Sequence, residues 1–296
     1  MPIIDAHVHL YPPELNREPA AWAARAGESH WARLCTRVRR NGRPVQGFPS
    51  VDELLRELDA AGVTRAALLG WYWEKPETCA WQNRFYAECI RAHPDRLSAF
   101  AALHPAVGAE EIETEIRRIY DEGFVGLGEL SPHSQGQGID EPAFCEALEL
   151  AAELRLPVNI HVTDPTGKNH PGRIETPFAE LLQLAQNFPR TNFILAHWGG
   201  LLPLMDASAA VLPNLFYDTA ASPLLYEPNV FRRMIDAVGP QRVLFGSDYP
   251  LILFPQEEKE PGMKIFLAQI DGAGLTTEEA GALLGANAAA LMKIPM

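Results

Sequence analysis

Short apolar segments alternate with longer amphipathic segments along the whole chain, and this alternation constrains the fold more than any other feature. Eight of the apolar segments have the length and the β-branched or aromatic residues typical of strands. They span residues 2–9, 63–71, 97–104, 124–130, 158–162, 193–197, 215–218 and 243–248. Continuously apolar strands between amphipathic helices predict a parallel sheet that is covered by helices.

The segments between these strands have helical periodicity, and several of them end at a glycine or just before a proline. Eight strand–helix units within 296 residues match a closed α/β barrel, the (β/α)8 or TIM barrel, better than an open sheet. The connection formed by residues 11–50 is too long for an ordinary loop of such a barrel. It leaves the end of the barrel where active sites lie, so we interpret it as an inserted lid. One domain is expected over residues 1–296.

The composition of the chain limits which partners and which cellular compartment are expected. The formal net charge of −13 disfavours a nucleic-acid partner, because phosphates must be neutralised by Lys and Arg. No charge-free stretch reaches the length of a membrane helix, and the first residues lack the basic and apolar regions of a signal peptide. The four cysteines include no CxxC pair, which indicates free thiols. We therefore expect a cytoplasmic protein without a membrane partner, and the sequence is compatible with a homo-oligomer.

Two histidines lie at the end of the first predicted strand. Side chains two positions apart on a strand share a face, so His7 and His9 are expected to project together into the mouth of the barrel. Two neutral imidazoles that lie side by side suit one divalent cation. The HxH pattern alone is not specific, because each histidine is also compatible with a hydrogen-bonded place in the core.

Further polar residues end other apolar strands, namely Glu129, His161, His197 and Asp248 on the fourth, fifth, sixth and eighth predicted strands. Packing does not explain polar residues at these positions, whereas the carboxyl ends of the strands form the catalytic rim of this fold. These residue types bind metals or transfer protons. Together with His7 and His9 they predict a metal-dependent enzyme.

The order of the motifs DAHVHL, NIH, AHWGG and LFGSDYP, followed by GANAAALM, resembles the amidohydrolase-related family. That family includes 2-amino-3-carboxymuconate-6-semialdehyde decarboxylase, related aromatic-acid decarboxylases, and some hydrolases and hydratases. The resemblance implies that His7, His9, His161 and Asp248 bind one divalent metal, usually zinc. Manganese is also possible, because affinity and availability do not separate zinc from manganese, iron or cobalt. It also implies that His197 is a nearby acid or base. Asp248 is a second candidate for accepting a proton.

The role of Glu129 stays open. Other branches of the superfamily carry a carboxylate at this strand that bridges two metals. If Glu129 is a ligand, His161 and His197 can hold a second ion. Otherwise Glu129 orients a ligand histidine through a hydrogen bond, which is common around metal sites.

The expected function is that of a metal-dependent hydrolase or decarboxylase acting on a small, anionic, aromatic or unsaturated carboxylic acid. Five arginines lie between residues 29 and 51, which contain no acidic residue. They form either a solvated helix face or a lid that pairs with substrate carboxylates. The aromatic run Trp71, Tyr72 and Trp73 either lines the mouth or packs in the core. The alternatives are a binuclear lactonase, phosphoesterase or nuclease, and a barrel that binds metal without catalysis.

Overall fold

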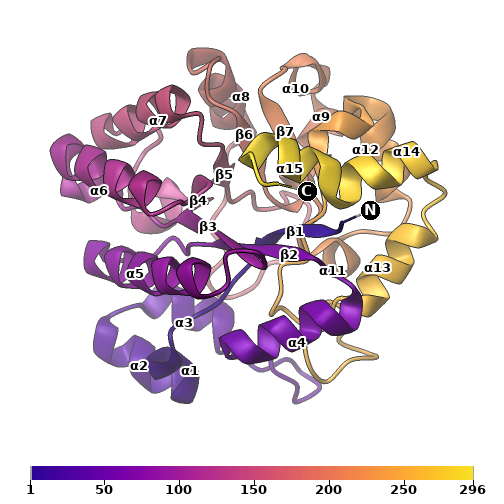
Figure 1. Ribbon diagram of the computed structural model, residues 1–296, viewed down its shortest axis with the longest axis horizontal. Helices are drawn as coiled ribbons and strands as arrows, with labels where there is room; N and C mark the ends of the chain where they lie inside the picture. Colours follow the sequence, from indigo (N-terminus) through magenta and orange to yellow (C-terminus); the bar gives the residue numbers. More distant parts are fainter. Residues whose placement is uncertain (1, 296) are drawn as a thin grey trace.

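Eight parallel strands form one sheet in the order of the sequence in the computed structural model, which describes residues 2–295. They are β1 (Ile4–Val8), β2 (Arg65–Leu69), β3 (Leu97–Ala101), β4 (Gly126–Leu130), β5 (Val158–Ile160), β6 (Phe193–Leu195), β7 (Leu215–Asp218) and β8 (Val243–Leu244). The Ala6 amide donates to the Phe245 carbonyl at 2.8 Å, and the His9 amide donates to the Tyr249 carbonyl at 2.7 Å. These bonds join the first strand to the segment around the last one, so the predicted TIM barrel is confirmed (Figure 1).

Helices follow the strands and surround the barrel, as the periodicity predicted (Figure 1). The main ones are α4 (Val51–Ala61), α5 (Pro76–Ala92), α6 (Ala109–Asp121), α7 (Pro142–Leu154), α8 (Phe178–Asn187), α9 (Leu202–Met205), α10 (Ala207–Val211), α12 (Val230–Val238) and α13 (Lys264–Asp271). A capping box at Ser50 begins α4, and Gly62 in a left-handed conformation ends it. The sequence signals for helix ends therefore coincide with the observed ends of this helix.

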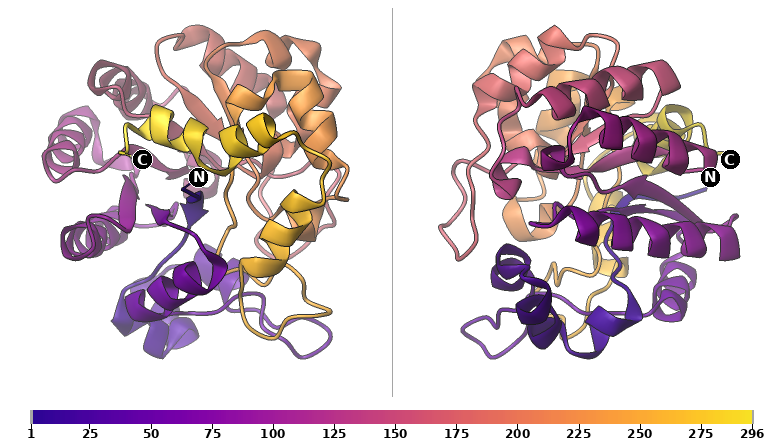
Figure 2. Two further views of the ribbon diagram at one scale, coloured as in Figure 1. Left: turned by 45° about the vertical axis from the view of Figure 1, so that its right-hand side comes forward. Right: turned by 90° about the vertical axis from the view of Figure 1, so that its left-hand side faces the viewer.

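Alternate residues of the strands belong to two different apolar cores. Ala66 and Leu68 of β2 pack outward against the helices, whereas Ala67 and Leu69 point into the barrel. Phe100 also lies inside the barrel. The last helices, α14 (Thr277–Gly281) and α15 (Asn287–Met292), lie across the end of the barrel near both chain termini (Figures 1 and 2). This end is closed by packing, so the opposite end is left for a functional site.

The strands are shorter than predicted, which corrects the position of several polar residues. His9, His161, His197 and Asp248 lie just beyond the last residues of β1, β5, β6 and β8 instead of on the strands. Here buried carboxylates replace neighbouring strands as hydrogen-bond acceptors. Asp5 Oδ1 accepts from the Ser247 amide, and Asp218 Oδ1 accepts from the His197 amide. The chain can therefore leave the regular ladder without losing backbone hydrogen bonds.

The 11–50 insertion contains three short helices, α1 (Pro13–Arg17), α2 (Pro19–Ala26) and α3 (Ser29–Cys35), at one side of the barrel (Figure 2). It is joined to the loop after β2 and to α5 by an aromatic cluster. The Trp22 and Trp81 rings stack at 4.9 Å, and the Trp31 and Trp73 rings lie 5.7 Å apart. Large aromatic side chains bury extensive apolar area, so this cluster anchors the insertion to the rest of the barrel. The role of the insertion as a lid remains a prediction.

Two arginines of the insertion, Arg39 and Arg43, are not part of a solvated helix face, whereas Arg33 and Arg40 are exposed. The Arg39 guanidinium donates to the Ile252 carbonyl at 3.1 Å, and that of Arg43 donates to the Pro255 and Glu258 carbonyls at 2.8 Å. These bonds tie the insertion to the segment after β8. Arg37 donates only to the Leu34 carbonyl and has no ion-pair partner within residues 2–295.

Two other expectations concern sequence features outside the barrel rim. The four cysteines are free thiols, as the sequence indicated. Among the described residues, no helix combines the length and the apolar character that a membrane span needs.

Candidate active site

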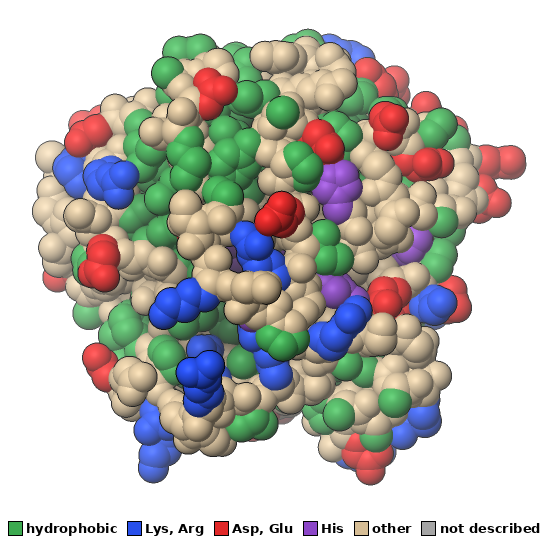
Figure 3. Space-filling model, turned by 180° about the vertical axis from the view of Figure 1, so that it is seen from behind, with side chains coloured by type: hydrophobic (Ala, Val, Ile, Leu, Met, Phe, Trp, Pro, Cys, Tyr) green, Lys and Arg blue, Asp and Glu red, His purple; other side chains and the backbone are tan. Residues whose placement is uncertain are grey.

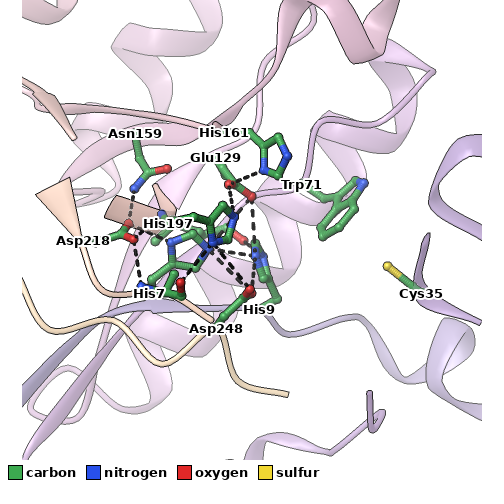
Figure 4. Close-up of polar contacts among 12 residues, drawn as sticks. His7, His9, Cys35, Trp71, Glu129, Asn159, His161, His197, Asp218 and Asp248 are labelled. Carbon is green, nitrogen blue, oxygen red and sulfur yellow. Dashed lines mark hydrogen bonds and ion pairs between the residues drawn. The ribbon is translucent and has the colours of Figure 1, made fainter. Parts of the chain in front are cut away.

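His7 and His9 direct one ring nitrogen each toward the same point. The His7 Nδ1 lies 2.9 Å from Asp218 Oδ2, and the His9 Nδ1 lies 3.1 Å from the Leu69 carbonyl oxygen. A carboxylate and a carbonyl only accept hydrogen bonds, so both Nδ1 atoms carry the hydrogen. The two Nε2 atoms consequently present lone pairs to each other at 3.1 Å (Figure 4). Lone pairs so close repel each other unless a proton or a cation lies between them.

Two carboxylates face the same pair of nitrogens (Figure 4). Glu129 Oε2 lies 3.9 Å from His7 Nε2 and 3.7 Å from His9 Nε2. Asp248 Oδ1 lies 3.8 Å and 3.6 Å from the same two atoms. Two neutral nitrogens and two anionic oxygens at these separations form a donor set that fits a divalent cation.

His161 and His197 lie on the other side of Glu129. The His161 Nδ1 is 2.9 Å from Glu129 Oε1, and the His197 Nε2 is 3.6 Å from the same oxygen. The two oxygens of Glu129 therefore face two pairs of histidines, and each pair forms a group with Glu129 that could hold a metal. The second nitrogen of His161 lies 3.3 Å from Thr163 Oγ1. The ligand set of His7, His9, His161 and Asp248 remains a prediction.

His197 stands in an unusual backbone turn. Five consecutive residues from His197 to Leu201 have positive φ, with 57° at His197, 58° at Trp198 and 64° at Leu201. Three of the five are not glycine, so this left-handed turn is strained and needs support from its surroundings. The His197 amide donates to Asp218, and the Trp198 indole donates to Ser222 Oγ at 2.9 Å. Trp198 is fully buried, so its role is packing and not stacking on a substrate.

Burial and the dense charges shift the pKa values of these groups. Burial lowers the pKa of His7, but Asp218, Glu129 and Asp248 outweigh it and raise the value to about 10. Burial together with His7 lowers the pKa of His9 to about 3. Burial raises the pKa of Asp248 to about 6, against the attraction of His7 and His197. The pKa values of the two imidazoles thus move in opposite directions, so His7 binds a proton more readily than His9.

Sequence reasoning missed Asp218, although it was recognised as the last residue of a strand. Its side chain is fully buried and accepts four hydrogen bonds, from His7 Nδ1, Asn159 Nδ2 and the backbone amides of His197 and Ala220. Its position at the end of an apolar strand is the same signal that singled out Glu129 and Asp248.

A glycine in the segment after β8 also makes room for His7. A Cβ at Gly246 would lie 2.7 Å from His7 Cβ, so this glycine allows the segment after β8 to approach β1.

The mouth of the barrel lies on the face opposite the termini, where Lys and Arg side chains gather near the middle beside histidines (Figure 3). Trp71 is buried and packs edge-on against His9 at 5.2 Å, with Tyr72 stacked on it at 4.5 Å. Cys35 of the insertion lies apart from the polar cluster, across from Trp71 (Figure 4). The aromatic run therefore packs in the core and also borders the site.

Other histidines and one arginine serve local structure. His104 Nδ1 accepts from the Ala106 amide at 3.2 Å, and His133 Nε2 pairs with Glu180 at 2.6 Å. His30 lies in α3, is buried and bonds to the Gly172 carbonyl. Arg173 donates to the Asp164 carbonyl at 2.9 Å.

Comparison with known proteins gives a family match over nearly the whole chain, since the family model described as amidohydrolase covers residues 4–294. A 2-amino-3-carboxymuconate-6-semialdehyde decarboxylase from Dictyostelium discoideum is 24% identical over 336 residues, which cover 96% of this chain and 90% of that protein.

Solved structures share the fold. One is the 5-carboxyvanillate decarboxylase of Novosphingobium aromaticivorans, complexed with manganese and 4-hydroxy-3-methoxy-5-nitrobenzoic acid. It has a TM-score of 0.73 at 16% identity, with 99% of this chain and 96% of that chain covered. The 2,6-dihydroxybenzoate decarboxylase from Rhizobium has a TM-score of 0.68 at 19% identity, with 99% of both chains covered.

Proposed function

This chain belongs to the amidohydrolase family, and we propose that it is a metal-dependent decarboxylase of a small aromatic or unsaturated carboxylic acid. The observation that carries the proposal is the convergence of the His7 and His9 Nε2 atoms with oxygens of two carboxylates at 3.6 to 3.9 Å. Relatives in sequence and fold are named as decarboxylases of such acids, and one of them was crystallised with manganese.

Zinc or manganese would be held by His7, His9 and Asp248, and His161 completes the set that the family resemblance implies. Imidazole and carboxylate ligands suit both metals. When bound, the ion supplies positive charge that orients an anionic substrate and stabilises the negative charge that develops during the reaction.

The protein's own contribution to chemistry lies in His197. In the proposed reaction the bond to the carboxylate carbon breaks, CO2 leaves, and the electron pair of that bond takes a proton to form a C–H bond. Burial lowers the pKa of His197, but Glu129 and Asp248 outweigh it and raise the value to about 9. The Nδ1 atom faces the Ala220 carbonyl at 3.2 Å, so Nε2 is the atom that can deliver the proton.

Positive charge near the mouth supports an anionic substrate despite the net charge of −13. Burial lowers the pKa of His170, and the positive charges of Arg37 and Arg173 lower it further. Arg37 is half-buried and has no carboxylate partner within residues 2–295. A guanidinium in that situation suits a substrate carboxylate.

The proposal is tested by elemental analysis of freshly purified protein together with a CO2-release assay. The panel contains 2,6-dihydroxybenzoate, 5-carboxyvanillate and unsaturated acids, along with lactones and esters as hydrolysis substrates. We expect metal-dependent CO2 release that a chelator abolishes and that added Mn²⁺ or Zn²⁺ restores. Hydrolysis of lactones or esters without CO2 release from any acid would refute the decarboxylase assignment.

A second candidate, a binuclear hydrolase such as a lactonase, phosphoesterase or nuclease, is favoured by the position of Glu129. Its two oxygens face two pairs of histidines, as a carboxylate that bridges two ions would. For this candidate we expect two ions per chain in the wild type and one in Glu129→Gln. The mononuclear decarboxylase predicts one ion in both proteins, and elemental analysis of the matched pair decides between them.

A further inference from the structure

The carboxylate of Asp218 connects the two halves of the active site. Its Oδ2 accepts from His7 Nδ1 at 2.9 Å and from Asn159 Nδ2 at 3.0 Å. Its Oδ1 accepts from the amides of His197 and Ala220, both at 3.0 Å. The group is fully buried and has no cation other than histidine beside it among the described residues. Four donors fill the acceptor sites of this buried carboxylate, so its position relative to both His7 and the turn at His197 is fixed.

We propose that Asp218 is a positioning residue that fixes the metal-binding tautomer of His7 and, through its other oxygen, the strained turn that carries His197. This inference rests on the proposed metal site and extends it to a residue outside the predicted ligand set.

The tautomer argument follows from the chemistry of imidazole. A neutral imidazole has one hydrogen, and a metal needs the nitrogen that lacks it. With Asp218 accepting at Nδ1, the His7 hydrogen is held there, and Nε2 keeps its lone pair for the ion. The Nε2 atom is the one that faces His9, Glu129 and Asp248. The carboxylate thus determines which nitrogen of His7 is available.

The variant Asp218→Asn separates the two halves of this role. The amide oxygen of the substituted side chain can still accept from the backbone amides of His197 and Ala220, so the turn keeps its support. The NH2 of that side chain then faces His7 and Asn159. Asn159 can adapt by turning its own amide, because its Oδ1 is buried without a partner among the described residues. His7 can adapt only by accepting at Nδ1, and its hydrogen then moves to Nε2, where it blocks the metal.

A matched control is Asp5→Asn. Asp5 is as buried as Asp218, but its Oδ1 accepts only from the backbone amides of His7 and Ser247, at 3.1 and 2.9 Å. It contacts no imidazole nitrogen of the described residues. The change therefore matches the change at position 218 in chemistry and burial without affecting the tautomer of His7.

The test is a Mn²⁺ titration of the metal-free full chain, in which free Mn²⁺ is followed by electron paramagnetic resonance. We expect the Kd for Mn²⁺ to rise about 10- to 100-fold in Asp218→Asn, as is typical when the hydrogen-bond partner of a ligand histidine is lost. For Asp5→Asn we expect a Kd within about a factor of three of wild type, because no ligand nitrogen loses its partner. Equal Kd values in Asp218→Asn and wild type, or equal weakening in both variants, would overturn the proposal.

A second measurement needs no variant. In zinc-loaded wild type with 15N-labelled histidine, the ring resonances of His7 should show hydrogen on Nδ1. An Nδ1 without hydrogen would contradict the proposal even if Asp218→Asn failed to fold.

Neither the Mn²⁺ titration nor the NMR measurement uses substrate. Weakened Mn²⁺ binding in Asp218→Asn without CO2 release by wild type would reject only the decarboxylase function. Unchanged binding in an active enzyme would reject only the role of Asp218, and a wild type that binds neither ion would reject both.

Discussion

His7→Ala is expected to purify without metal and to lose at least about 1000-fold in kcat/KM, which corresponds to about 4 kcal/mol of transition-state stabilisation. The reason is the position of the His7 Nε2 atom, which lies 3.1 Å from His9 and within 3.9 Å of both carboxylates. Removal of this nitrogen also leaves the buried Asp218 without its imidazole partner. Elemental analysis and the CO2-release assay measure the two losses.

Chelator sensitivity separates metal loss from unfolding. An ion that binds only the folded state raises the Tm, so a chelator should lower the Tm of wild type and leave that of His7→Ala unchanged. Asp248→Ala should repeat this behaviour, because its Oδ1 faces the same two nitrogens. The control is His93→Ala, at the end of α5 and away from the barrel mouth, which should retain the ion. A His7→Ala protein with a full complement of metal would exclude His7 as a ligand.

The barrel and the rim of the active site were predictable because they depend on periodicity. Apolar strands and amphipathic helices recur along the chain, and residues at the carboxyl ends of parallel strands must meet at one end of the barrel. His7 and His9 could be paired from their spacing alone, since alternate residues of a strand share a face. In the structure the Nε2 atoms of the two histidines lie 3.1 Å from each other.

Contacts between distant residues were not predictable in the same way. Asp218 reaches His7 across 211 positions of sequence, and no local pattern distinguishes a carboxylate that accepts four hydrogen bonds from one that binds a metal. The five left-handed residues after β6 are equally hidden, because His, Trp and Leu rarely adopt positive φ. Tertiary hydrogen bonds stabilise this turn, and these are absent from the local sequence.

The arginines of the insertion illustrate the same limit. Their clustering without acidic residues suggested either solvent or substrate as the partner. Arg39 and Arg43 instead donate to backbone carbonyls of a segment more than 200 positions away, whereas Arg37 keeps its guanidinium free of carboxylates within residues 2–295. Charge patterning identifies a group that needs a partner, but the partner is known only once the fold brings segments together.

His197→Asn is expected to keep its metal and to lose about 10²- to 10⁴-fold in kcat, the range typical of a lost general acid. Asn is the suitable replacement because it tolerates the left-handed conformation that His197 adopts at φ 57°. The backbone amide at this position can still donate to Asp218. The change therefore removes the proton carrier while it preserves the turn, and KM should change little.

The neighbouring Tyr226 provides the matched control, because its hydroxyl donates to the His197 carbonyl at 3.4 Å and not to the imidazole. Tyr226→Phe should keep kcat within about a factor of three of wild type, since no proton carrier is removed. Added imidazole should partly restore the activity of His197→Ala, because a free imidazolium ion can occupy the vacated space and supply the proton. If His197→Asn instead loses an ion, His197 is a ligand of a second metal together with Glu129 and His161, and the protonation role assigned to it is wrong.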